Sequence, residues 1–296
     1  MVDGGVSKIN TQIKLTQTDI ERVLSTSDQV VRKAYGGMCL SGEHRWAAYT
    51  QKEVDFITNE CDLRKGELVI DFGCGNGRHA FLLAEQGICV DAVDYVATRI
   101  EHAEKMRVSG KHDSIRFISD DCRTVQLSAA RVVLCLYDIV GSYTNHEDNM
   151  SILRNIFNHL KPGGFAFISV MNYEMTEAQA KYRFSLSSDA LSLLELKPSN
   201  IMEKTGNVFN PEFYLVDTET KIVYRKEQFR DKNMLPVELV VRDRRYTRNE
   251  IEQMCKEVGF EVLFSRYVSA KDWETNLPPT SESAKEILLK CIRPLS

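Results

Sequence analysis

A glycine-rich turn that follows an apolar run is the feature of this chain most suited to hold a ligand. Residues 69–87 read VIDFGCGNGRHAFLLAEQG, in which an apolar stretch ends at Asp71 and a helical pattern follows the turn. Glycine lets a backbone approach a ligand closely, and the first amides of a helix can donate to a polar ligand. Asp94 ends the next apolar run, where an acid can accept both hydroxyls of a ribose. The turn glycines are Gly73, Gly75 and Gly77.

The spacing of these residues separates two kinds of nucleotide ligand. A dinucleotide turn has the pattern G-x-G-x-x-G and holds a pyrophosphate. This chain has G-x-G-x-G, with Asp71 two residues before the first glycine. That carboxylate would repel a pyrophosphate and would attract an amine, which a nucleoside joined to an amino acid carries. The pattern therefore favours S-adenosylmethionine as the cofactor, and a tight strand–helix turn without a ligand is the alternative.

The elements that must position this turn alternate along the chain. Such alternation is typical of a parallel sheet with helices on both faces. The run VVLCL at 132–136 is continuously apolar, as a strand buried on both faces requires. Strands are predicted at 68–72, 88–93, 115–119, 131–137 and 164–171, and helices at 77–86, 96–108 and 146–160.

The pattern changes after residue 172. Alternating apolar and polar positions predict half-exposed antiparallel strands at 212–217, 221–229 and 237–245. Thr247 and Glu250 have capping-box spacing and predict a last helix that ends at Gly259. Two further strands are predicted at 260–268 and 285–292.

Two amphipathic helices are predicted before the turn. Thr18 and Glu21 form a capping box that begins the first, and the second covers about 43–60. Two helices are too few to bury a core of their own. The predicted fold is α/β, a doubly wound Rossmann-like domain at 61–296, with a small antiparallel β insertion at about 174–246 that covers the substrate. An arm and a helical lid at 1–60 precede it.

The order of the motifs resembles the class I S-adenosylmethionine-dependent methyltransferases. VIDFGCGNG, CVDAVD and RFISDDC resemble the first three motifs of that family, and VVLCLYDIVGSY resembles the strand and loop that face the methyl group. LKPGGFAFISVMN resembles its Lys-Pro-Gly-Gly turn and fifth strand. The family implies a seven-stranded sheet whose last strand inserts antiparallel. The cofactor contacts that the resemblance implies are Asp71, Gly73, Cys74, Gly75, Gly77, Asp94, Tyr95, Asp121, Cys122 and Tyr137.

A narrower likeness concerns the acceptor. The β insertion and the SY and MNYE segments are similar to small-molecule methyltransferases such as glycine and amino-sugar N-methyltransferases. In these enzymes the N-terminal helices and the insertion close over the substrate. The likeness implies a small-molecule acceptor and assigns Arg45 to the methionine carboxylate of the cofactor; a solvated helix arginine is the alternative.

Candidate acceptor-side groups follow the fourth and fifth predicted strands, whose ends line the ligand crevice. An amine acceptor needs only to be neutral, whereas a hydroxyl acceptor needs a base, for which His146 and His44 are the candidates. Alternatively, His146 simply opens a helix. The catalytic candidates are His146, Asp138, Tyr143 and His44, and the substrate-side candidates at the fifth strand are Asn172 and Tyr173.

The stretch 221–248 is basic in an acidic chain. It holds nine Lys or Arg against four acids, while the whole chain has a net charge of −4. One interpretation is an anionic substrate or RNA backbone, with Arg242, Arg244 and Arg245 as ligands. The alternative is the solvated face of an edge sheet, where cations discourage aggregation.

Composition excludes several classes. The net charge gives no general field for nucleic acid or membrane, and no apolar run approaches the roughly 18–20 residues of a spanning helix. No secretion signal is visible in MVDGGVSKIN, so a cytoplasmic location is expected. No Cys-x-x-Cys or other metal-ligand spacing occurs, so no metal is predicted. The sequence predicts methylation of N or O of a small molecule; an RNA (cap or tRNA) methyltransferase and a non-catalytic cofactor-binding regulator are the alternatives.

Overall fold

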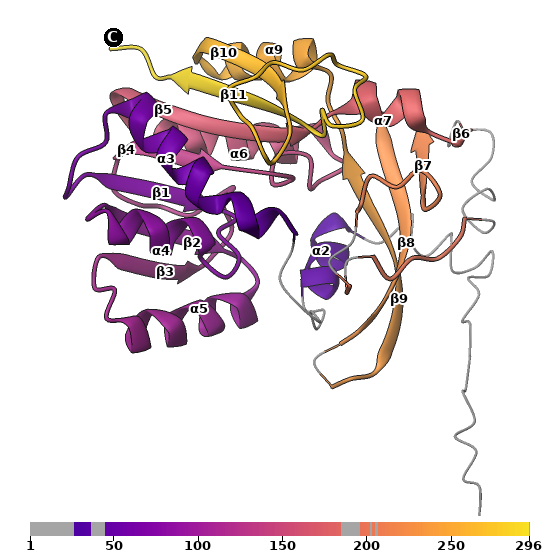
Figure 1. Cartoon of the computed structure of the whole chain (residues 1–296), viewed down its shortest axis with the longest axis horizontal. Coiled ribbons are helices and arrows are strands. Elements are labelled where there is room, and N and C mark those ends of the chain that lie inside the picture. Colours follow the sequence, from indigo (N-terminus) through magenta and orange to yellow (C-terminus); the bar gives the residue numbers. More distant parts are fainter. Residues whose placement is uncertain are drawn as a thin grey trace, which may run out of the picture.

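A seven-stranded sheet forms the centre of the main domain (Figure 1). The structure, a computed structural model, describes residues 27–36, 45–184, 196–201, 203–204, 207–231 and 233–295. The strand order is β10-β11-β5-β4-β1-β2-β3. The strands are β1 Leu68–Phe72, β2 Cys89–Asp94, β3 Ile115–Ser119, β4 Ala130–Cys135, β5 Leu160–Met171, β10 Glu261–Val268 and β11 Glu286–Ile292.

The sheet is parallel except at its C-terminal hairpin. Strand β1 pairs in parallel with both β2 and β4, and β4 pairs in parallel with β5. Strand β11 lies between β5 and β10 and is antiparallel to both. This arrangement confirms the predicted doubly wound sheet with an inserted last strand.

Two apolar cores cover the two faces of the sheet. Successive residues of β1 point to opposite faces, so Val69 joins one core and Ile70 the other. Three helices pack on the face of the sheet to which Val69 points: α3 Thr50–Cys61, α4 Arg78–Glu85 and α5 Ala97–Gly110. Two helices pack on the opposite face, to which Ile70 points: α6 His146–Asn158 and α9 Arg248–Val258. Helix α9 begins with the predicted Thr247–Glu250 capping box.

A second, four-stranded sheet has the order β6-β7-β8-β9. Strands β7 Tyr214–Asp217, β8 Ile222–Arg230 and β9 Pro236–Arg244 confirm the predicted antiparallel insertion. Helix α7 Tyr173–Gln179 and strand β6 Tyr182–Phe184 were not expected from the pattern. The prediction of half-exposed strands is wrong for β7, which is wholly buried, and for β8, which is almost wholly buried. One cause is that Ser199 covers β8 from the side: its N–H donates to Lys226 O, and its carbonyl accepts from Gln228 N.

Of the N-terminal helices, one lies between the main sheet and the small sheet, and α3 crosses the face of the main sheet that α4 also covers (Figure 1). Helix α2 Asp28–Gly36 contacts β9 of the small sheet, and α3 packs on α4. The predicted second helix begins with a 3-10 turn at Arg45–Tyr49. The predicted capping box at Thr18 and Glu21 lies outside the described residues. Within the described ranges no helix is long and apolar enough to span a bilayer.

Candidate functional site

The glycine turn joins β1 to α4 in a conformation that side chains rarely adopt. Gly73, Gly75 and Gly77 have φ values of 77°, 56° and 83°. A Cβ on Gly73 would lie 2.2 Å from Ile139 Cδ1, and one on Gly77 would lie 2.5 Å from Phe117 Cζ. A Cβ on Gly75 would meet no atom within 4 Å. The turn therefore needs glycine for its backbone and leaves open space at Gly75.

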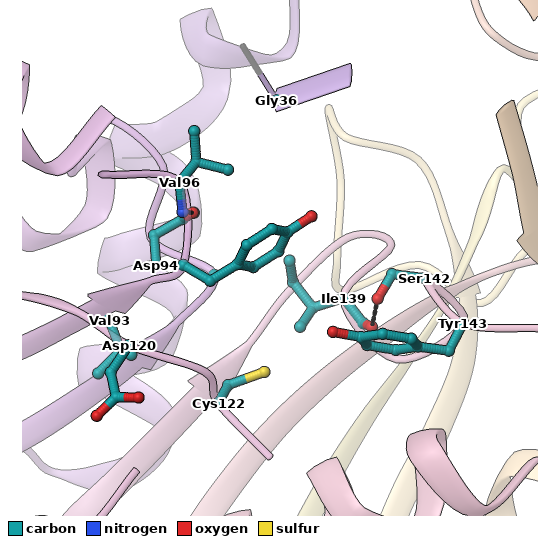
Figure 2. Close-up of a pocket in the computed structure, with 11 residues that line it drawn as sticks. Gly36, Val93, Asp94, Val96, Asp120, Cys122, Ile139, Ser142 and Tyr143 are labelled. Carbon is teal, nitrogen blue, oxygen red and sulfur yellow. Dashed lines mark hydrogen bonds between the residues drawn. The ribbon is translucent and has the colours of Figure 1, made fainter. Parts of the chain in front are cut away.

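A cavity of about 120 Å³ lies between this turn and the loop after β4 (Figure 2). The sulfur of Cys122 points into the space between the β2 end and that loop. Ser142 Oγ donates to Ile139 O at 2.7 Å, which fixes the loop on the opposite wall. The lining residues are Gly36, Gly73, Val93, Asp94, Tyr95, Val96, Asp120, Cys122, Ile139, Ser142 and Tyr143.

The Asp94 carboxylate links the glycine turn to the residues that follow β2. Its Oδ2 accepts from Gly75 N at 2.9 Å, and its Oδ1 accepts from Val96 N at 2.8 Å. Burial raises the pKa of this carboxyl above its usual value despite those hydrogen bonds. Asp94 lines the cavity and lies where its carboxylate can meet ribose hydroxyls.

Residues of the third motif, RFISDDC, lie in two different environments: some line the cavity, and one forms an ion pair. Asp120 and Cys122 line the cavity. Asp121 instead accepts from Arg123 Nε and Nη2, and Arg123 Nη1 donates to Asp148 at 2.5 Å. Burial alone would raise the pKa of Asp121, but the Arg123 hydrogen bonds hold it below its usual value. The assignment of Asp121 to the adenine stays a prediction.

Two buried polar atoms beside the turn have no hydrogen-bond partner. They are Asp71 Oδ2 and Arg78 Nη2. Asp71 is 3% exposed, and burial raises its pKa although His79 and Arg78 oppose this. An unpaired carboxylate oxygen and an unpaired guanidinium nitrogen fit the ammonium and carboxylate of an amino acid. The residues at the turn therefore fit the methionine part of S-adenosylmethionine.

Replacing Arg78 with Met is expected to weaken binding of S-adenosylmethionine about tenfold or more, because a charge-assisted hydrogen bond contributes about 1.5–3 kcal/mol. The affinity for 5′-methylthioadenosine should change little, since that ligand has no carboxylate. Calorimetry with both ligands makes the comparison. An equal loss for both would show that Arg78 acts only by holding α3 against α4.

A cluster of buried polar side chains surrounds Tyr137, at the end of β4. Tyr137 has a positive φ of 69°, and its ring lies 4.6 Å below the Arg78 guanidinium. Its hydroxyl donates to Glu53 at 2.5 Å, and Glu53 also pairs with Arg78 and His79. Tyr137 N donates to Ser169 Oγ at 2.5 Å. Helix α3 is thereby tied to the β4 loop.

The same cluster extends to Glu286, the first residue of β11. Ser169 Oγ donates to Glu286 Oε2 at 2.8 Å. Burial raises the pKa of Glu286 to about 7. Glu53 and Asp138 also raise it, while Ser169 and Arg78 lower it. Sequence reasoning missed Glu53, Ser169 and Glu286; the one local signal is an acid at the start of the otherwise apolar run EILL.

The protein should therefore lose stability as pH rises, relative to a Glu286→Gln variant. The folded state keeps the Glu286 proton up to a pH of about 7, whereas the unfolded chain releases it near 4.5, as an ordinary solvated glutamate does. The stabilising contribution is full below pH 4.5 and is lost as pH rises through 7. Between pH 5 and 8 the difference in unfolding free energy should fall by about 2–3 kcal/mol. Urea titrations at each pH measure it, with the exposed Glu282→Gln as control; a flat difference contradicts the shift.

The acceptor-side candidates lie in different surroundings. Tyr143 is buried, lines the cavity, and packs its ring 4.4 Å from the Arg123 guanidinium. Asp138 is half-buried on the same loop. His146 is the exposed first residue of α6 and is not among the described residues that line the cavity. His44 and the side chain of Arg45 lie outside what the structure describes.

Asn172 and Tyr173 are both buried and bonded within the protein. Asn172 caps α7, and its Nδ2 donates to Pro279 O and Ala284 O. Tyr173 Oη donates to Glu177 at 2.9 Å. These bonds fix the exit of the insertion from β5. Their assignment to the substrate stays a prediction.

The arginines at the end of β9 and directly after it are paired with acids rather than solvated. Arg242 Nε donates to Asp28 Oδ1 at 2.5 Å, which links β9 to α2. Arg244 Nη2 donates to Glu250 at 2.9 Å. Arg245 is 0% exposed and donates to Asp243 and Thr176. The solvated-edge interpretation is therefore wrong for Arg242 and Arg245, because Asp28, distant in the sequence, pairs with Arg242 and Asp243, two residues earlier, pairs with Arg245.

Comparison with known proteins identifies a methyltransferase domain in this chain. Residues 69–164 match a family model described as a methyltransferase domain. The chain is 33% identical over 110 residues to cypemycin N-terminal methyltransferase of Streptomyces sp, covering 35% of this chain and 41% of that protein. It is 27% identical over 180 residues to ubiquinone biosynthesis O-methyltransferase of Rickettsia typhi, covering 57% and 67%.

Solved structures agree with the fold. The CcbJ methyltransferase from Streptomyces caelestis superposes with a TM-score of 0.60 at 14% identity, covering 83% of this chain and 89% of that one. An S-adenosylmethionine-dependent methyltransferase from Clostridium acetobutylicum gives 0.58, also at 14% identity, covering 86% and 93%. The sheet order and the glycine turn are those of the class I methyltransferase fold. The family match and the shared fold identify residues 69–164 as a methyltransferase domain. The alignments cover between 41% and 67% of the two curated relatives named above.

Proposed function

We propose that this protein transfers a methyl group from S-adenosylmethionine to a nitrogen or oxygen of a small molecule. The observation that carries the proposal is the pair of unpartnered atoms, Asp71 Oδ2 and Arg78 Nη2, beside a glycine turn and the cavity-lining Asp94. When bound, S-adenosylmethionine supplies a methyl group that its sulfonium already activates.

The protein's contribution is then to position the two reactants and to exclude water. Asp71 and Arg78 hold the amino-acid end, and Asp94 holds the ribose. Cys122 and Tyr143 line the space for the base, where they keep water out. The remaining proposed contacts on the turn and neighbouring strands are Gly73, Cys74, Gly75, Gly77, Tyr95, Asp121 and Tyr137, with Arg45 from the N-terminal segment.

Acceptor chemistry follows from the groups near the β4 loop. An amine acceptor needs only to be bound in its neutral form, whereas a hydroxyl acceptor needs a base to remove its proton. Asp138 and Tyr143 lie on that loop, whereas His146 is exposed. Asp138 and Tyr143 are therefore better candidates than His146 for the group that contacts the acceptor. The insertion at 174–246 is proposed to select the acceptor, because it leaves the sheet at the C-terminal end of β5.

The basic stretch gives little support to the RNA alternative. Arg225, Lys226, Arg242 and Arg245 are all buried, so their charges do not face a solvent-borne backbone. RNA binding through 221–248 would need exposed cations.

The N-terminal segment 1–60 is proposed to be an arm and lid on the domain at 61–296. Gly36 lines the cofactor cavity, and Asp28 bonds Thr144 and Arg242. Hydrogen exchange of α2 and α3 should slow when S-adenosylmethionine is added, because the bound cofactor favours the closed arrangement. Exchange that slows only at the glycine turn would argue against a lid.

The function is tested with methyl-labelled S-adenosylmethionine and a cell extract separated into small molecules and RNA. Label in the small-molecule fraction supports the proposal, and label in RNA supports the RNA alternative. Cofactor binding with no label in either fraction supports a non-catalytic regulator. A protein that binds no S-adenosylmethionine at all overturns the proposal.

A further inference from the structure

A second, larger cavity adjoins the cofactor cavity. Its volume is about 360 Å³, within the range of small-molecule pockets. Tyr143 lines both cavities, so the two meet at the end of the loop after β4. The described residues that line it are Ser27, Asp28, Gln29, Arg123, Tyr143, Thr144, Asp148 and Arg242. It is named here the polar cavity.

Four separate parts of the chain line the polar cavity: the start of α2, the segment after β3, the β4 loop with the start of α6, and β9. The start of α2 gives Asp28, β9 of the insertion gives Arg242, and the start of α6 gives Asp148. Asp28 joins these parts, since its Oδ1 accepts from Arg242 and its Oδ2 accepts from Thr144 N and Thr144 Oγ1, both at 2.6 Å. The lid, the insertion and the β4 loop thus meet around one space.

The walls of the polar cavity are charged but balanced. Two arginines and two aspartates line it. Arg242 pairs with Asp28 at 2.5 Å, and Arg123 pairs with Asp148 at 2.5 Å. Arg242 and Asp28 are 7% and 9% exposed, so their pairing occurs in a low-dielectric site. A ligand with a large net charge would have to compete with these pairs, and an apolar ligand would leave their outer atoms desolvated.

We propose that the polar cavity holds the methyl acceptor and that the acceptor is a small hydrophilic molecule with little net charge, either zwitterionic or hydroxyl-rich. This inference rests on the proposed methyl transfer and adds the site and class of its acceptor. The guanidinium and carboxylate groups offer such a molecule donors and acceptors together. The cofactor cavity, which apolar residues such as Val93, Val96 and Ile139 line, contrasts with it.

The first test uses methyl-labelled S-adenosylmethionine with a small-molecule extract partitioned between water and chloroform. After unreacted S-adenosylmethionine is removed, labelled product is expected in the aqueous phase. Label confined to the organic phase overturns the inference while leaving methyl transfer intact. Cofactor binding without labelled product in either phase overturns the proposed methyl transfer, and the inference with it. A protein that fails to bind the cofactor refutes the proposed function itself, which keeps the two failures distinct.

The second test replaces Arg242 with Met and titrates the aqueous phase. The extract concentration that gives half-maximal transfer should rise at least tenfold, with the cofactor Kd changing less than threefold, because the lost contact lies on the acceptor side. Arg230→Met is the matched control, since Arg230 ends β8 at an exposed position.

Asp148→Asn gives a second variant if Arg242→Met does not fold. Asp148 is 37% exposed in its side chain, so the change should be tolerated. It should also raise the half-saturating extract concentration without a matching loss of cofactor affinity. Acceptor kinetics unchanged in the folded variants, or a collapse of cofactor binding alone, would show that the acceptor lies elsewhere.

Discussion

Replacing Asp94 with alanine is expected to weaken S-adenosylmethionine binding ten- to hundredfold. The carboxylate should accept both ribose hydroxyls, and charge-assisted hydrogen bonds of this kind contribute about 1.5–3 kcal/mol. The same carboxylate orders the turn by accepting from Gly75 N and Val96 N, which adds to the loss. Isothermal titration calorimetry with purified protein measures the change.

The ligand series makes this prediction specific. 5′-Methylthioadenosine keeps the ribose, so Asp94→Ala should weaken its binding by a similar factor, in contrast to Arg78→Met. Asp113→Ala is the matched control, because the Asp113 side chain is 96% exposed and far from the cavity lining. An Asp94→Ala protein that binds both ligands as tightly as the parent would contradict the assignment of Asp94 to the ribose.

The sequence was sufficient for the parts of the fold that local pattern determines. Strand β4 could be predicted because both of its faces are buried and the run VVLCL at 132–136 is continuously apolar. The turn could be predicted because Asp71 and the three glycines lie within seven consecutive residues, 71–77. The antiparallel position of β11 came from the family resemblance and not from the residues of β11 themselves.

The sequence was insufficient where distant segments meet. The Tyr137–Glu53 bond joins residues 84 positions apart, and the Ser169–Glu286 bond joins residues 117 apart. Arg242 could not be distinguished from a solvated cation because Asp28 lies 214 positions away. Charge neutralisation of this kind depends on tertiary contacts, which hydropathy patterns do not contain. The polar cavity was missed for the same reason, since four separate parts of the chain line it.

Replacing Arg245 with Met is expected to lower the free energy of unfolding by about 3 kcal/mol, the smaller end of the range for breaking a buried ion pair. Arg245 is completely buried; its Nε donates to Asp243 at 2.9 Å and its Nη1 to Thr176 at 2.7 Å. Met fills much of the same volume, so the loss reports the charge rather than a cavity. Two features limit the cost. Asp243 keeps Arg225 as a partner at 2.6 Å, and Arg245 Nη2 already lacks a hydrogen bond.

Urea-induced unfolding at pH 7 measures this loss, and Arg248→Met is its matched control. Arg248 lies three residues along the chain, is 37% exposed, and lies 3.9 Å from Glu252, so its removal should cost less than about 1 kcal/mol. The affinity for S-adenosylmethionine should remain near that of the parent at a temperature where the variant is folded, because Arg245 is not among the described residues that line either cavity. An Arg245→Met protein as stable as the parent, with weaker acceptor use, would instead make Arg245 a substrate ligand and would require the insertion to open.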